Sequence, residues 1–211
     1  MLRAGIYNQT AHHMEALADL NSAVMLDAEN YHAIYQRANA EFELGMYTEA
    51  KADYQRLQRI NSRSLESLLG LARVAVKENN LGMANEYLEQ AVGLDVNNPE
   101  IYTRRASVKK MMGNHNGAVE DLIVALSIDS KNQKALESLV DYGNTNYVAT
   151  INGLTNAIRQ APNVGMYRYI RGVIAQAHYN YLSAIDDYKY IIDNRLYNYS
   201  GLNASIAECQ F

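Results

Sequence analysis

The chain has 211 residues, of which 48% are hydrophobic and 20% are charged, with 12 Gly and 2 Pro. This composition is too apolar for an intrinsically disordered chain and too poor in chain-breaking residues for a turn-rich β-sandwich. The formal net charge of -4 supplies no overall attraction to nucleic acid phosphates or anionic lipids. One cysteine excludes an internal disulfide, and no apolar run is long enough for a transmembrane helix.

The sequence has an internal period of 34 residues. Three contiguous blocks, 31–64, 65–98 and 99–132, carry apolar residues at helical spacing, so each predicts two amphipathic helices. A turn lies between the two helices at Gly45, Asn79 or Gly113. The blocks share small residues at positions 8 and 20 and a large apolar residue at position 24: Ala38, Ala72 and Ala106; Ala50, Ala84 and Ala118; Tyr54, Leu88 and Leu122.

The same frame extends in both directions along the chain. Residues 1–30 form a first repeat that lacks its opening, and residues 133–164 form a degenerate repeat that is two residues short in its first helix or turn. Residues 165–198 restore the period, and residues 199–211 begin another repeat. Solenoids normally end in polar caps, whereas this chain stops at an apolar partial helix. We therefore expect the chain to be a segment of a longer protein. In that case the lack of a signal sequence in these residues does not indicate the cellular compartment.

These positions resemble the tetratricopeptide repeat family, in which small residues at 8 and 20, an aromatic residue near 24 and Ala at 27 mark a helix-turn-helix. The chain departs from that pattern at position 4, where Ile34, Leu68 and Tyr102 replace Trp. The resemblance implies an all-α fold across residues 1–211, a right-handed superhelical solenoid of antiparallel helix-turn-helix repeats.

A charge pattern accompanies the repeats. Where position 7 is Leu71 or Leu139, position 23 is Tyr87 or Gly153, whereas the other four repeats have Arg at position 7 and Asp at position 23. This joint presence predicts ion pairs between the two helices of one hairpin. The alternative, a row of arginines that binds anions, is less favoured because each Arg has a matched Asp. The predicted pairs are Arg3 with Asp19, Arg37 with Asp53, Arg105 with Asp121, and Arg171 with Asp187.

No motif indicates catalysis, a metal or a cofactor. The histidines do not share one register position, and His13 and His115 occupy a turn position where other repeats have Tyr or Leu. Cys209 falls at an apolar helix position, which favours a packed thiol over a nucleophile. We therefore expect no enzymatic activity, no metal site and no cofactor.

The resemblance also implies that first-helix positions 2, 5, 6, 9, 12 and 13 face a concave groove that binds a peptide or a protein. The middle of this groove is locally basic, which favours an acidic ligand, although a solvated helix face is the simpler explanation of the same charges. Only Asn39 and Arg104 match the residues with which some family members bind chaperone tails, so that ligand is not expected. The groove positions hold Tyr35, Asn39, Phe42, Leu69, Arg73, Lys77, Thr103, Arg104, Ser107, Lys110 and Lys134.

The function predicted from these features is a protein–protein interaction scaffold. One alternative is self-association through end-to-end contacts or through the tyrosines in and directly after the last full repeat, Tyr167, Tyr169, Tyr179, Tyr181, Tyr188, Tyr190, Tyr197 and Tyr199. A second alternative is single-stranded RNA binding, as in helical-hairpin families with a 35-residue period. The 34-residue period and the acidic net charge disfavour it, so no nucleic acid partner is expected.

Overall fold

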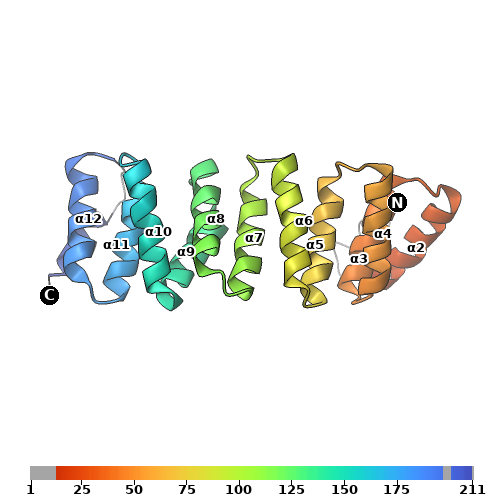
Figure 1. Cartoon of the computed structure of the whole chain (residues 1–211), viewed down its shortest axis with the longest axis horizontal. Coiled ribbons are helices and arrows are strands. Elements are labelled where there is room, and N and C mark those ends of the chain that lie inside the picture. Colours follow the sequence, from red (N-terminus) through yellow and green to blue (C-terminus); the bar gives the residue numbers. More distant parts are fainter. Residues whose placement is uncertain (1–12, 197–200, 211) are drawn as a thin grey trace. The chain divides into compact units, whose positions relative to one another are not determined.

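The structure of this chain is a computed structural model that describes residues 13–196 and 201–210. It consists of helices joined by short turns (Figure 1). Within these residues no strand occurs. The chain divides into two compact units, Met1–Val96 and Asn97–Phe211, and each is described by itself.

The first unit stacks one helix and two helical hairpins. The partners of each hairpin pack against one another, and α3 packs on both α2 and α5. Its helices are α2 (His13–Leu26), α3 (Tyr31–Glu43), α4 (Tyr47–Ile60), α5 (Leu65–Lys77) and α6 (Leu81–Leu94).

The second unit contains three hairpins and a short final helix. The hairpins pack in sequence order, with α8 against α9 and α10, and α10 against α11. Its helices are α7 (Pro99–Met111), α8 (His115–Ile128), α9 (Gln133–Thr145), α10 (Tyr147–Gln160), α11 (Gly165–Ala177), α12 (Tyr181–Asp193) and α13 (Leu202–Glu208).

The first helix of each hairpin begins at the first residue of a predicted repeat, at 31, 65, 99, 133 and 165. Side-chain oxygens of Asn30, Ser64, Asn98 and Asn132 accept a backbone N–H of the first turn, which satisfies a donor that has no partner within the helix. Pro99 follows Asn98 at the first helical position, where its missing N–H costs nothing. The local sequence therefore specifies where these helices start.

The turns inside the hairpins need a left-handed residue. Gly45, Asn79 and Gly113 have φ values of 78°, 57° and 75°, which Gly and Asn tolerate best. Tyr179 occupies the equivalent position of the last full repeat with φ 61°. The degenerate repeat has a shorter turn: Asn146 alone separates α9 from α10, whereas residues 44–46 separate α3 from α4.

Small residues allow the helices to approach, and large residues fill the space between them. The alanines at positions 8 and 20 of the three contiguous repeats are all buried, and so are Tyr54, Leu88 and Leu122 at position 24. Ile60, which also follows the apolar pattern, is 41% exposed because it is the last residue of α4.

Candidate protein interface

The position-7 arginines of the described residues bind the position-23 aspartates through two parallel hydrogen bonds. Arg37 Nε and Nη2 donate to the two carboxylate oxygens of Asp53 at 2.6 and 2.8 Å. The corresponding distances are 2.9 and 2.7 Å for Arg105 with Asp121. They are 2.7 and 2.7 Å for Arg171 with Asp187. Arg3, the predicted partner of Asp19, lies outside the described residues.

The third guanidinium nitrogen joins a hairpin to the helix before it. Arg37 Nη1 donates to Asn21 of α2 at 3.2 Å, and Arg171 Nη1 donates to Thr155 of α10 at 2.9 Å. The hydrogen bonds to the aspartates raise the pKa of both arginines above the ordinary value. These guanidinium groups hold three helices together, so their donors are occupied by protein acceptors rather than offered to an anion.

A second cation approaches the aspartate in the second unit. Lys109 Nζ lies 2.9 Å from Asp121, and Arg168 Nη1 lies 3.2 Å from Asp187. Neither cation was predicted from the sequence. The position of Lys109, one helical turn after Arg105 on α7, is a signal that could have indicated it.

Glu41 of α3 occupies the repeat position that Lys109 has in α7. The side chain at this position is therefore an acid in the first unit and a cation in the second. The Glu41 side chain is buried, and Oε2 has no hydrogen-bond partner among the described residues. Burial raises the pKa of Glu41 to about 7, the charge of Asp53 adds to this shift, and Arg37 opposes it. An acid in this state was not predicted, because its cause is the tertiary environment rather than the residue type.

The predicted groove positions of the first unit meet across α3 and α5. The Arg73 guanidinium lies over the Phe42 ring, 4.0 Å from its centroid, and Arg73 Nη2 is 2.6 Å from Glu43 Oε1. Asn39 accepts a hydrogen bond from the Tyr54 hydroxyl at 2.8 Å. Tyr35 and Leu69 are half-buried and Lys77 is exposed.

In the second unit two of the predicted groove cations, Arg104 and Lys110, lie beside carboxylates. Arg104 Nη2 is 2.5 Å from Glu100, and Lys110 Nζ is 3.6 Å from Asp141. Ser107 and Lys134 are exposed. Together with Glu43 beside Arg73, these acids neutralise much of the positive charge that the sequence predicted for the groove.

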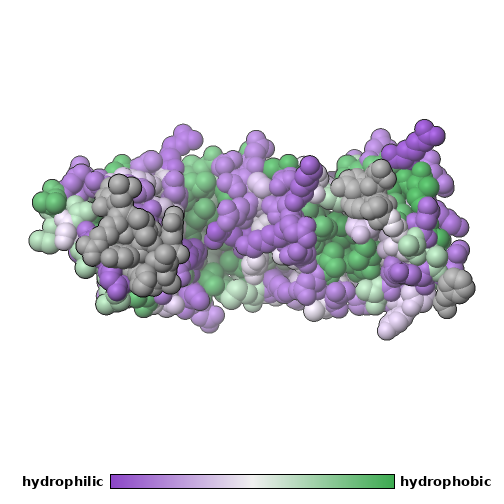
Figure 2. All heavy atoms as spheres, turned by 180° about the vertical axis from the view of Figure 1, so that it is seen from behind, coloured by the Kyte–Doolittle hydropathy of each residue, from purple (hydrophilic) through white to green (hydrophobic). Residues whose placement is uncertain are grey.

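Thr103 was predicted to face the groove, and this prediction is wrong. Its side chain is 1% exposed, and Oγ1 donates a hydrogen bond to the Pro99 carbonyl one turn earlier in α7 at 2.9 Å. A side chain that is 1% exposed is not accessible to a partner. Figure 2 shows hydrophobic areas set among hydrophilic side chains on the face that is turned away in Figure 1.

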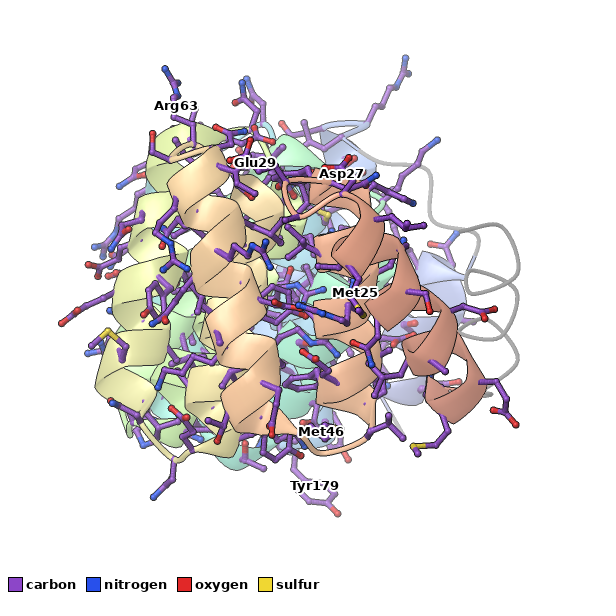
Figure 3. The ribbon with its side chains drawn as sticks, turned by 90° about the vertical axis from the view of Figure 1, so that its right-hand side faces the viewer. Met25, Asp27, Glu29, Met46, Arg63 and Tyr179 are labelled. Atoms are coloured by element: carbon purple, nitrogen blue, oxygen red, sulfur yellow. The ribbon has the colours of Figure 1, made fainter. Side chains whose placement is uncertain are left out.

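The tyrosines of the last full repeat divide between core and surface. Tyr167 and Tyr188 are buried, whereas Tyr179 is 80% exposed and points away from the ribbon (Figure 3). The Tyr179 and Tyr181 rings meet edge to face at 6.1 Å. Tyr197 and Tyr199 lie outside the described residues.

The described residues contain no group of three His, Cys, Asp or Glu side chains that could hold a metal. Cys209 packs in a core cluster with Leu202 and Ile206, and burial raises the pKa of its thiol. No helix in the described part of the chain has the length and apolar character needed to cross a membrane.

Comparisons with known proteins agree with this architecture. Residues 31–63 and 65–98 match the model of the tetratricopeptide repeat family. Cellulose synthase operon protein C of Pseudomonas fluorescens (strain SBW25) is 30% identical over 135 residues, which are 59% of this chain. The match spans only 11% of that relative's length.

Solved structures share the fold. A tetratricopeptide repeat protein from Parabacteroides merdae superimposes with a TM-score of 0.62 at 18% identity, over 99% of this chain and 82% of that one. YrrB, described as a tetratricopeptide repeat protein with an unusual peptide-binding site, gives a TM-score of 0.54 at 15% identity, over 91% and 98%. Stacked repeats of this kind form extended concave surfaces. Residues 31–63 and 65–98 are therefore tetratricopeptide repeats, and the described residues have the fold of the solved tetratricopeptide repeat proteins.

Proposed function

We propose that the chain is a non-catalytic scaffold that binds a partner protein or peptide through the groove surface of its first helices. The observation that supports this most is the arrangement of Phe42, Glu43 and Arg73. Side chains of two successive first helices, α3 and α5, form one surface there, with a cation stacked on an aromatic ring. Phe42 itself is buried at 7% exposure, so Arg73 is the part of this arrangement that a partner can reach. Arg is among the residues that carry much of the binding free energy at protein interfaces.

The ligand that fits this surface is an extended polypeptide with both polar and apolar side chains. The Arg73 and Glu43 side chains are 33% and 46% exposed, so both charges remain accessible. Because Arg73, Arg104 and Lys110 already lie beside carboxylates, a strongly acidic ligand gains less from this groove than from an uncompensated basic one. The half-buried Tyr35 and Leu69 supply the apolar part of the contact.

Affinity capture with charge-reversed variants tests the proposal. Arg73→Glu and Arg104→Glu together should reduce recovery of groove-bound partners, because each places a carboxylate beside Glu43 or Glu100. The matched control is Arg59→Glu with Lys189→Glu, which makes the same charge change at exposed positions of the second helices α4 and α12. Equal recovery of every partner by both variants would defeat the proposal.

Self-association is a second candidate, and the exposed Tyr179 favours it. A large aromatic side chain that is held in a left-handed turn and mostly in solvent is typical of a contact residue. Light scattering over a range of protein concentrations, with Tyr179→Ala as the comparison, tests this candidate. A monomer at every concentration would exclude it.

A further inference from the structure

A cavity of about 260 Å³ opens between α7 and α9, the first helices of two successive repeats in the second unit, and lies over α8. Its buried lining consists of Ala106, Ala118, Leu122 and Tyr142, and the Tyr142 hydroxyl is hydrogen-bonded to His115 Nδ1. Its rim carries the exposed Ser107, Lys110 and Asp141, together with the half-buried Ser138. A mostly apolar lining with a polar rim is the usual form of a pocket that receives a side chain.

The first unit fills the equivalent place with a ring of its own. Tyr54 of α4 is completely buried, and its hydroxyl donates to Asn39 of α3. The ring lies directly over Gly70 of α5, where a Cβ atom would come within 2.4 Å of it. The small residue at 70 and the amide at 39 therefore accommodate one aromatic side chain between α3 and α5.

Two periods later the residues that fill this space have changed. Leu122 stands in the place of Tyr54, Ser138 in that of Gly70, and Ser107 in that of Asn39. The helices that carry them begin at equivalent residues, since α3, α4 and α5 start 68 residues before α7, α8 and α9. Leucine is shorter than tyrosine and reaches less far toward the groove, which explains why a cavity remains in the second unit.

We propose that this cavity receives a phenylalanine side chain of the polypeptide bound in the groove. Its volume is larger than that of an apolar cavity of about 150 Å³ that binds benzene, so a phenyl ring fits. The buried Ala106, Ala118 and Leu122 side chains offer no partner for a tyrosine hydroxyl, and the Tyr142 hydroxyl is already bonded to His115, so a phenyl ring fits better than a phenol. This inference rests on the proposed function, because it names the anchor side chain of the same groove ligand.

The rim has the groups that an anchored peptide needs. The Ser107 and Ser138 hydroxyls and the Lys110 and Asp141 side chains surround the opening and can bond the peptide backbone beside the ring. Met111 also lines the cavity and is 54% exposed, and its unbranched side chain can move as a ring enters.

Toluene, which has the shape of the phenylalanine side chain, is the probe for the first experiment. With the full chain, toluene should shift the methyl NMR signals of Ala106, Ala118 and Met111 in a saturable way. The shifts of p-cresol, which adds a hydroxyl group at the far edge of the ring, should saturate at several-fold higher concentration. Absence of saturable toluene shifts, or equal binding of both compounds, would overturn the phenylalanine assignment.

A variant that copies the first unit provides the control. Leu122→Tyr, Ser138→Gly and Ser107→Asn together should fill the cavity, abolish the toluene shifts and raise the unfolding temperature, whereas Ser107→Asn alone should keep the shifts. If the triple variant does not fold, Ser107→Leu covers the opening from an exposed position of α7. Undiminished toluene shifts in the folded blocking variant would overturn the proposal.

The blocking variant also links the cavity to the partner. Its recovery of groove-bound partners should fall several-fold relative to Ser107→Asn, and equal recovery would overturn the anchor role. Because the toluene measurement needs no partner, its failure would reject this pocket while the result with Arg73→Glu and Arg104→Glu still decides the proposed function.

Discussion

Glu41 and Asp53 approach the same guanidinium group. Arg37 Nε lies 2.6 Å from Asp53 Oδ2 and 3.8 Å from Glu41 Oε1. In the equivalent hairpin of the second unit, Lys109 takes the place of Glu41 and its Nζ lies 2.9 Å from Asp121. The same repeat position therefore adds a negative charge beside the buried pair in one unit and a positive charge in the other.

The stability of the first unit should depend on the protonation of Glu41. Its pKa rises from 4.5 to about 7 on folding, so native Glu41 binds a proton that the unfolded chain has released in this interval. Its stabilising contribution is full below pH 4.5 and is lost as the pH rises through about 7. The loss is on the order of 2 kcal/mol. Hydrogen exchange of the α3 and α4 amides should show this decline, and Glu41→Gln should remove it; a variant with the wild-type pH dependence would contradict the assignment to Glu41.

Exchanging the two charges tests the repeat comparison directly. Glu41→Lys should raise the unfolding temperature above pH 7, because a second cation then lies beside Asp53 as Lys109 lies beside Asp121. The reciprocal change, Lys109→Glu, should destabilise the second unit by about 1–3 kcal/mol. Thermal unfolding of both variants supplies the measurement. Changes of the same sign in the two variants would show that the charge at this position does not act through the aspartate.

The pair of Arg37 and Asp53 should behave as one energetic element. Removal of Arg37 leaves the buried Asp53 carboxylate without these hydrogen bonds and should cost about 3–5 kcal/mol, whereas removal of Asp53 leaves the half-buried guanidinium and should cost less. Removal of both should cost clearly less than the sum of the two single losses. Urea unfolding of Arg37→Ala, Asp53→Ala and the double variant gives the coupling free energy. Additive losses would mean that the two side chains stabilise the fold independently.

Tyr54 and Gly70 should be coupled through space. A methyl group at residue 70 would meet the Tyr54 ring at 2.4 Å, so Gly70→Ala should destabilise the first unit by about 1–3 kcal/mol. In the Tyr54→Leu background the same change should cost much less, because Leu122 and Ser138 coexist at these positions in the second unit. Urea unfolding of the two single variants and the double variant measures the coupling. A cost of Gly70→Ala that is the same in both backgrounds would reject the contact.

The backbone of Tyr179 should be strained, because a residue with a side chain is held there at a positive φ. Its φ of 61° lies in the region that Gly45 and Gly113 occupy in other repeats. Tyr179→Gly should stabilise the chain by about 1 kcal/mol relative to Tyr179→Ala, since both remove the ring and only Gly removes the strain. Thermal unfolding of the two variants tests this, and equal stabilities would show an unstrained turn.

The repeat period made most of the fold predictable. Alanines at positions 8 and 20, left-handed residues at 45, 79 and 113, and capping residues such as Asn98 act over a few residues, so the helix starts and turns follow from local sequence. The Arg and Asp positions could be matched because they appear and disappear together among the repeats. The repeats of this one chain therefore show covariation between positions 7 and 23.

The candidate site was less predictable, because its properties come from neighbours on other helices. The acids beside Arg73 and Lys110 were overlooked, since residues 43 and 141 become neighbours of these cations only when successive first helices pack side by side. Thr103 does not reach the groove surface because packing buries its side chain, which its register position does not show. The pKa of Glu41 depends on the burial of its side chain, and residue spacing does not predict that burial.

The sequence by itself determined the all-α repeat architecture, the helix boundaries and the identity of the paired charges, because caps, turns and helical periodicity are local properties that recur with every period. Only the tertiary structure decided which carboxylates neutralise the groove cations, why Glu41 has a raised pKa, and that Leu122 leaves a cavity where Tyr54 fills one. These features depend on the volume and charge that neighbouring helices bring to one point, and packing rather than periodicity sets them.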